Sequence, residues 1–66
     1  MNIDKLKGKI VANGMNVELL ATAIGIDRSS LYRKLNNFEK FTIGEAKAIK
    51  GVLNMTDAEA CEIFLS

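Results

Sequence analysis

The residues with the clearest chemical potential lie near the middle of the chain, on one face of a predicted helix. Ser29, Arg33 and Asn36 follow one another at i, i+4 and i+7, which places their side chains on the same side. Arg28 and Tyr32 flank this row. Arginine can donate two hydrogen bonds to guanine, serine can bond any base, and asparagine suits adenine or a phosphate oxygen. An ordinary solvated helix surface shows the same residue types, so the neighbouring elements must decide between these interpretations.

Two short helices joined by a tight turn are predicted to position this face. The first helix carries apolar residues at the spacing of a single face: Val17, Leu20, Ala21 and Ile24. Asn16 is its expected N-cap, and Gly25 is expected to end it in the left-handed conformation. The chain restarts with Asp27 as the next N-cap, and Leu31 and Leu35 form the buried stripe of the second helix. Two helices so closely spaced around a glycine are typical of the unit that places its second helix in the DNA major groove.

This segment resembles the helix-turn-helix of the lambda-repressor-like family, the Cro/CI type of phage regulators. Ala21 matches the small residue where the two helices cross, Gly25 the turn glycine, and Leu31 the apolar anchor of the recognition helix. The resemblance extends over nearly the whole chain, because an amphipathic helix precedes the motif and residues 41–64 look like the family's last two helices. It implies an all-α fold, a compact bundle of about five short helices forming one domain over residues 1–66.

The resemblance also implies a Cro-like repressor that reads a double-stranded DNA operator with the helix at about residues 27–37. Four residues match positions that contact DNA in the family: base-reading Arg28, Ser29 and Arg33, and phosphate-contacting Asn36. Their surroundings add four more candidates: Tyr32 for a base, and Ser30, Asn37 and Lys40 for phosphates. Binding is expected from a weak homodimer on a two-fold-symmetric site, where occupancy would exclude RNA polymerase.

The first motif helix departs from the family pattern at three positions. Its first residue, often a glutamine that touches the DNA backbone, is Val17, and the usually polar positions that follow include Leu19 and Ala23. A contiguous exposed apolar patch often marks a protein contact. The alternative function is therefore a modulator or antirepressor that uses this surface to bind a partner repressor.

Amphipathic helices are predicted on both sides of the motif. A helix over residues 2–12 buries three apolar residues and presents Lys5, Lys7 and Lys9, which either face water or reach DNA phosphates. Two capping boxes begin the last two helices, the first at Thr42 and Glu45, the second at Thr56 and Glu59. Asn54 is expected to end the first of these helices in the left-handed conformation.

The flanks of the last two helices carry a possible self-association surface. Val52, Cys61 and Leu65 lie outside the predicted inner faces and either complete the core or form a dimer seam. Phe38 and Phe41 are expected to pin the preceding loop to the core.

Composition narrows the remaining function classes. The chain has 66 residues and a net charge of +1, divided into +3 over residues 1–40 and −2 over residues 41–66. With no histidine and one cysteine, a zinc site of the usual Cys/His kind cannot be assembled. Most of the carboxylates lie at predicted helix starts, where capping explains them. We therefore expect no enzyme, cofactor, metal or small-molecule substrate, and a soluble cytoplasmic protein without a membrane segment.

Overall fold

Five α-helices form the part of the chain that the computed structural model describes, residues 1–36 and 41–65. In chain order they are α1 (Ile3–Ala12), α2 (Val17–Ile24), α3 (Arg28–Asn36), α4 (Ile43–Val52) and α5 (Asp57–Phe64). No strand occurs in these two ranges, so the predicted all-α fold of five short helices is confirmed. Within the same residues, no helix combines the length and apolarity needed to cross a membrane.

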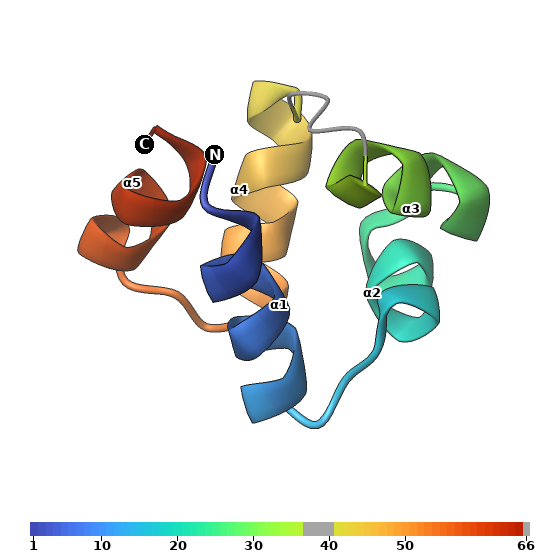
Figure 1. Cartoon of the computed structure of the whole chain (residues 1–66), viewed down its shortest axis with the longest axis horizontal. Coiled ribbons are helices and arrows are strands. Elements are labelled where there is room, and N and C mark those ends of the chain that lie inside the picture. The colour runs from blue at the N-terminus through green and yellow to red at the C-terminus, as the bar shows by residue number, and fades with distance from the viewer. Residues whose placement is uncertain (37–40, 66) are drawn as a thin grey trace.

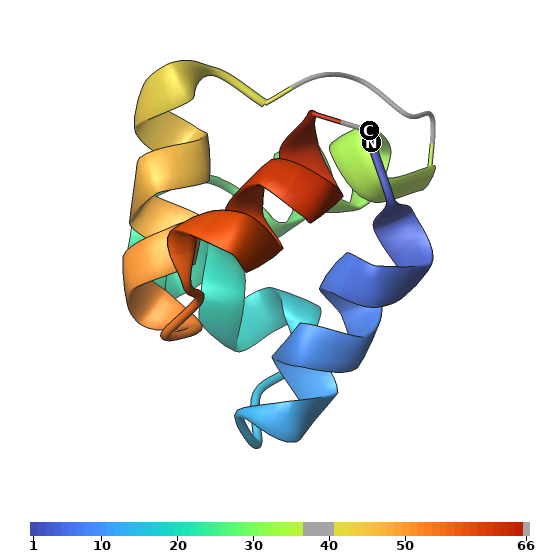
Figure 2. The ribbon, with the colours of Figure 1, turned by 90° about the vertical axis from the view of Figure 1, so that its left-hand side faces the viewer.

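The helices divide the molecule into two ends along its longest dimension, which measures 27 Å. In Figure 1, α2 and α3 lie at one side, α5 lies at the other, and α1 and α4 lie between them. We call these the α3 end and the α5 end. Figure 2 looks onto the α5 end and shows α5 lying between α4 on one side and α1 on the other, both of which it contacts. At the α3 end, α2 contacts both α3 and α4.

A single apolar core joins all five helices. Every helix contributes at least one side chain, and seven large ones are essentially inaccessible to solvent: Leu6, Leu20, Leu31, Leu35, Ile49, Leu53 and Ile63. These side chains belong to the inward faces that the helical spacing predicts. Met55, in the turn between α4 and α5, is also buried although no periodic pattern includes it.

Three helices end with the same backbone device. Gly14, Gly25 and Asn54 have φ values of 66°, 78° and 53°, the left-handed region that favours glycine and asparagine. The next residue in each case, Met15, Ile26 or Met55, donates its N–H to the carbonyl five residues back, at 3.0 Å. Because these next residues also pack on or within the core, each turn both stops a helix and anchors the chain.

Most helix starts are capped as predicted. Asn16 Oδ1 accepts from the Leu19 N–H at 2.8 Å, and both Thr42 and Thr56 form complete capping boxes with a glutamate three residues later. The first helix starts one residue later than predicted, because Asn2 caps it rather than joining it. Within the described ranges, the Asp27 side chain makes no capping bond, and only its carbonyl accepts, from the Leu31 N–H.

Candidate nucleic-acid interface

The outward face of α3 gathers the side chains that the spacing predicts. Arg28, Ser29, Arg33 and Asn36 are exposed. Tyr32 is 46% exposed, and Ser30 is half-buried at the edge of the face. The opposite side of the same helix is dry, with Leu31 and Leu35 at 0% and 2% exposure. One nine-residue helix therefore separates an apolar anchor from a row of hydrogen-bond donors.

The turn between α2 and α3 fixes that face relative to the core. Gly25 adopts a left-handed conformation that costs other L residues about 1–2 kcal/mol. The Ile26 N–H then donates to the Ala21 carbonyl at 3.0 Å, and Ile26 packs against the core. Ala21 is 1% exposed, and its small side chain suits the close approach of α2 and α3. The orientation of α3 is thus determined by backbone hydrogen bonds and packing rather than by a loose loop.

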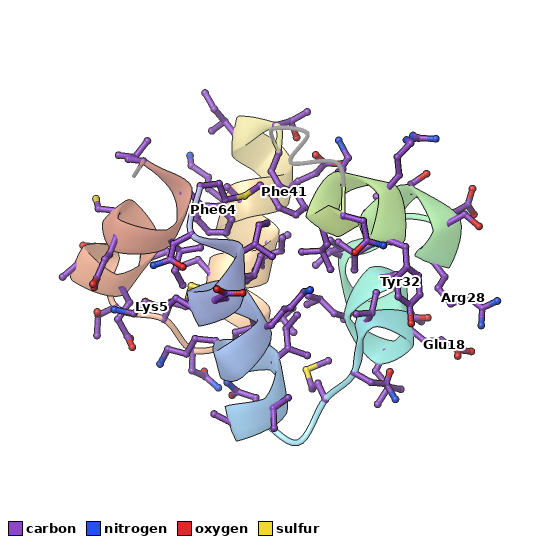
Figure 3. The ribbon with its side chains drawn as sticks, in the orientation of Figure 1. Lys5, Glu18, Arg28, Tyr32, Phe41 and Phe64 are labelled. Carbon is purple, nitrogen blue, oxygen red and sulfur yellow. The ribbon has the colours of Figure 1, made fainter. Side chains whose placement is uncertain are left out.

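Arg28 is held at the outer edge of this face by an ion pair with α2. Its Nη1 atom lies 3.4 Å from Glu18 Oε2, and both side chains point away from the body of the molecule (Figure 3). A guanidinium has five N–H donors, so one bond to Glu18 leaves others for a further contact. The ten-residue separation becomes a contact because the turn folds α3 back across α2.

The third cation of α3 points the other way. Lys34 Nζ lies 3.3 Å from Glu45 Oε1 and 5.9 Å from the centroid of the Phe41 ring, so Lys34 joins α3 to the start of α4. The pKa of Glu45 is lowered, mainly by the hydrogen bond from the Thr42 backbone N–H and further by Lys34. Phe41 in turn packs edge-to-face on Phe64 at 5.8 Å, which confirms its predicted role as an anchor. Lys34 is therefore a structural cation, while Arg28 and Arg33 carry the charge of the outward face.

The three lysines of α1 also differ in role: two form ion pairs with α5, and one is exposed near α3. Lys5 pairs with Glu62, and Lys9 Nζ lies 2.5 Å from Glu59 Oε2, so both are committed to α5. The hydrogen bond from Lys9 is the main reason that the pKa of Glu59 falls to about 2. Lys7 is exposed and instead lines a depression of about 480 Å³ that it shares with Asn36 at the end of α3. Of the three, Lys7 alone adjoins the candidate interface.

The apolar surface predicted on α2 is smaller than expected. Leu19 is 52% exposed and Ala23 is exposed, but Val17 is half-buried and packs against the core. Val17 therefore lies on the inward face that its spacing with Leu20 and Ala21 predicts, and its place on the exposed patch was wrong. Leu19 remains the main apolar side chain that α2 shows to solvent.

The remaining predicted residues have different outcomes. Asn37 and Lys40, proposed for phosphates, and Phe38, proposed as an anchor, lie outside the described residues. Val52 is half-buried against the core, whereas Cys61 on α5 and Leu65 directly after α5 are exposed. The predicted seam of three residues is thus reduced to two.

Comparison of the chain with protein-family models, with curated proteins and with solved structures gives no match. Within residues 1–36 and 41–65, no three side chains of His, Cys, Asp or Glu gather in a way that could hold a metal ion. The function must therefore be argued from the shape and charge of the surface.

Proposed function

We propose that this protein is a sequence-specific binder of double-stranded DNA and acts as a small transcriptional regulator of the Cro-like repressor type. In this proposal α2 and α3 form a helix-turn-helix, and α3 enters the major groove of the operator. Occupancy of the operator would exclude RNA polymerase. The proposal is one of binding, without catalysis.

The observation that carries the proposal is the polar outward face of α3 above a fully buried anchor. Arg28, Ser29 and Arg33 are exposed along this face, while Leu31 beneath them is 0% exposed. A helix of nine residues is about 13 Å long, which matches the rise of about four base pairs. Because α3 is held rigidly by its turn, its side chains can be presented to base edges at little entropic cost.

Phosphate contacts would flank the base-reading row. Asn36 and Lys7 line one depression at the end of α3 together with the carboxylate of Asp4, and in this proposal Asn36 and Lys7 supply the donors to a phosphate there. Ser30 lies at the other edge of the face, and Lys40 is proposed for the connection that follows α3. Such contacts carry most of the affinity and its dependence on salt, whereas the α3 face would carry the preference for sequence.

The test is selection of bound duplexes from a random pool at two salt concentrations. We expect enrichment of a two-fold-symmetric site with half-sites about 10 base pairs apart. Arg33→Ala or Arg28→Ala should then cost about 1–3 kcal/mol and relax the preference at one base position. Lys5→Ala removes the same charge from the side facing α5 and should leave the base preference unchanged (Figure 3).

One observation favours a second candidate function, binding of a partner repressor through α2. Leu19 is 52% exposed beside the Glu18–Arg28 pair, an apolar side chain that DNA binding does not require. Leu19→Lys should hardly disturb a protein that binds DNA alone, but it would disrupt an interface on α2. If the selection recovers only unspecific, salt-sensitive DNA and Leu19→Lys abolishes capture of a repressor, the DNA-reading proposal fails and this one replaces it.

A further inference from the structure

The ion pair between Glu18 and Arg28 is exposed to an extent that structural ion pairs of this molecule are not. Its side chains are 68% exposed at Glu18 and 61% exposed at Arg28. By contrast, the Lys34–Glu45 pair, which joins α3 to α4, is 18% exposed on both sides. Exposed pairs contribute little to stability, because water and salt screen them. The Glu18–Arg28 pair is therefore not explained by a need to hold α2 and α3 together, which packing and the turn already do.

The pair lies where a helix-turn-helix meets the bases. Arg28 is the first residue of α3, and the N-terminal residues of the second helix in such a motif contact base edges. Glu18 belongs to the first turn of α2, and its Oε2 atom lies 3.4 Å from Arg28 Nη1. Figure 3 shows Tyr32 at the same edge of the molecule as this pair. The carboxylate thus holds the guanidinium from the outer, solvent side of the motif.

We propose that Glu18 is a positioning residue, which holds the Arg28 guanidinium so that it reads a guanine instead of binding a phosphate. The inference rests on the proposed function and adds to it a residue of α2 that determines specificity. Glu18 touches no base in this arrangement and acts only through Arg28. The base pair read at the start of α3 is then G·C, and the preference for it depends on both members of the ion pair.

The donors of the guanidinium are sufficient for both contacts at once. Arginine carries five N–H donors in a planar fork, and the bond to Glu18 uses one of them, on Nη1. The edge formed by Nε and Nη2 remains for the two acceptors of guanine, O6 and N7. Reading the base therefore does not require Arg28 to leave Glu18, and the bond between them limits the directions in which the fork can point.

Without Glu18, the DNA backbone would compete for the same side chain. An arginine fork fits two phosphate oxygens as well as it fits guanine, and such a contact adds affinity but no sequence preference. The Glu18 carboxylate opposes this exchange in two ways. It repels a phosphate that comes close, and it would lose its own partner if Arg28 turned toward the backbone. An acid beside the recognition helix therefore lowers unspecific affinity and favours the complex in which Arg28 meets a base.

A second acid at the same place provides a matched control. Asp27 directly precedes Arg28 and is exposed. Within residues 1–36 and 41–65, its carboxylate forms neither a hydrogen bond nor an ion pair with Arg28. Asp27→Asn therefore removes the same charge beside the same helix end and leaves the hold on Arg28 intact. Asparagine is also well tolerated before a helix, so the start of α3 should be retained.

Selection of bound duplexes by the wild type and by variants of the ion pair tests the proposal. The wild type should prefer guanine at one position, and Arg28→Ala should abolish that preference. Glu18→Ala should reduce it about threefold or more while the other positions keep theirs. Its affinity for unspecific duplex should rise, and the slope of log affinity against log salt should steepen by about one unit, because Arg28 gains a phosphate. Asp27→Asn should keep the guanine preference.

The double variant Glu18→Ala/Arg28→Ala separates positioning from any other role of Glu18. If Glu18 acts only through Arg28, its removal should change no base preference once Arg28 is absent. Glu18→Gln, which keeps an acceptor oxygen but not the charge, should lie between the wild type and Glu18→Ala. Circular dichroism of each variant checks that the helices are retained.

Nuclear magnetic resonance of the arginine side chains tests the hold on Arg28 without DNA. The chain has two arginines, Arg28 and Arg33, so the spectrum of their Nε–H groups contains two signals. Glu18→Ala should shift the Arg28 signal and increase the mobility that its relaxation reports. The Arg33 signal serves as the internal reference and should change little.

The outcomes distinguish failure of this inference from failure of the proposed function. A guanine preference that survives Glu18→Ala, a Glu18→Ala effect that persists without Arg28, or an Arg28 signal that does not respond overturns the positioning role alone. If the wild type enriches no site although its Arg28 signal responds to Glu18→Ala, the proposed function fails. The positioning role is then overturned with it, and the pair is an ordinary surface ion pair.

Discussion

The two ends of this molecule rest on the same core but expose opposite kinds of surface. At the α3 end, Leu31 is fully buried and the residues above it are polar or cationic. At the α5 end, Ile63 is equally buried, yet Cys61 on the helix and Leu65 directly after it are exposed beside the acids Asp57 and Glu62. Helical packing explains the buried side of both elements and leaves the outer side undetermined. The outer residues are therefore where a difference in function between the ends can be encoded.

The start of α3 also differs from the starts of α4 and α5. Both α4 and α5 start with complete capping boxes and carry acids in the first turn, which neutralise the positive end of the helix dipole. The first turn of α3 contains no acid, although Asp27 stands directly before it. Capping boxes therefore satisfy N–H groups at the starts of α4 and α5, whereas no such box is present at the start of α3 in the described residues.

Removing a buried leucine should break the α3 end with the largest effect. Leu31→Ala removes a side chain with 0% exposure and should cost about 2–5 kcal/mol of unfolding free energy. The same substitution at Leu65, which is 79% exposed, should change stability by about 0.5 kcal/mol or less. Urea unfolding of the two variants measures this contrast. Equal losses would mean that Leu65 packs against something in the free protein.

A pair of glycine substitutions, one in the turn at the α3 end and one in α4 between the two ends, should have effects of opposite sign on stability. Gly25→Ala forces a side chain into a left-handed conformation and should cost about 1–2 kcal/mol, although no atom would obstruct the new methyl group. Gly51→Ala places a methyl group in equally open space within α4 and should gain about 0.5–1 kcal/mol. Thermal or urea unfolding distinguishes them. A stabilising Gly25→Ala would contradict the backbone account of the turn.

Much of the fold could be predicted from local patterns, because the features that carry it are local. The apolar spacing of Leu31 and Leu35, the left-handed ends at Gly25 and Asn54, and the capping box at Thr42 each involve residues within one helical turn. Burial and backbone conformation at these positions follow from periodicity and side-chain type alone. The outward row on α3 follows from the same periodicity, since the face opposite a buried stripe must meet solvent.

Features that depend on how helices cross could not be predicted in this way. The Glu18–Arg28 pair spans two helices, and Lys34 turns toward Glu45 of the next helix. At Val17 two sequence indications conflict, because the helical spacing predicts a buried face while the family pattern usually has a polar residue there. The packing resolves the conflict, since Val17 is half-buried against the core. Ile43 was not predicted as an exposed residue, because its exposure depends on where α5 lies beside α4.

Acid should weaken the attachment of the α5 end to α1. Glu59 has a pKa of about 2, against an ordinary value of 4.5, chiefly because Lys9 donates a hydrogen bond to it. A carboxyl with a lowered pKa in the folded state stabilises the protein fully above its unfolded pKa, and this contribution is lost as the pH falls toward 2. Urea midpoints between pH 6 and pH 2 should therefore decline more for the wild type than for Glu59→Gln.

A substitution on the other side of this pair checks the cause. Lys9→Met keeps the capping box of α5 but removes the main source of the lowered pKa. Its acid dependence should lie between those of the wild type and Glu59→Gln. If Lys9→Met titrates like the wild type, the capping hydrogen bonds rather than Lys9 hold the pKa of Glu59 low.

The smallest expected effect is also the sharpest comparison of the two ends, because the same chemical change is made at each. Glu18→Gln and Glu62→Gln each remove one negative charge from an exposed ion pair, the first with Arg28 and the second with Lys5. Exposed pairs of this kind contribute about 1 kcal/mol or less, so neither variant should unfold the protein. If DNA lies along α3, loss of the Glu18 carboxylate should strengthen binding to unspecific duplex by about two- to fivefold, since one repulsive charge beside the phosphates is gone. Loss of the Glu62 carboxylate, on the side facing α5, should leave that affinity nearly unchanged. Fluorescence anisotropy at low salt measures the affinity of both variants for unspecific duplex. Equal increases in affinity would mean that only the net charge of the protein affects binding and that DNA does not lie preferentially along α3.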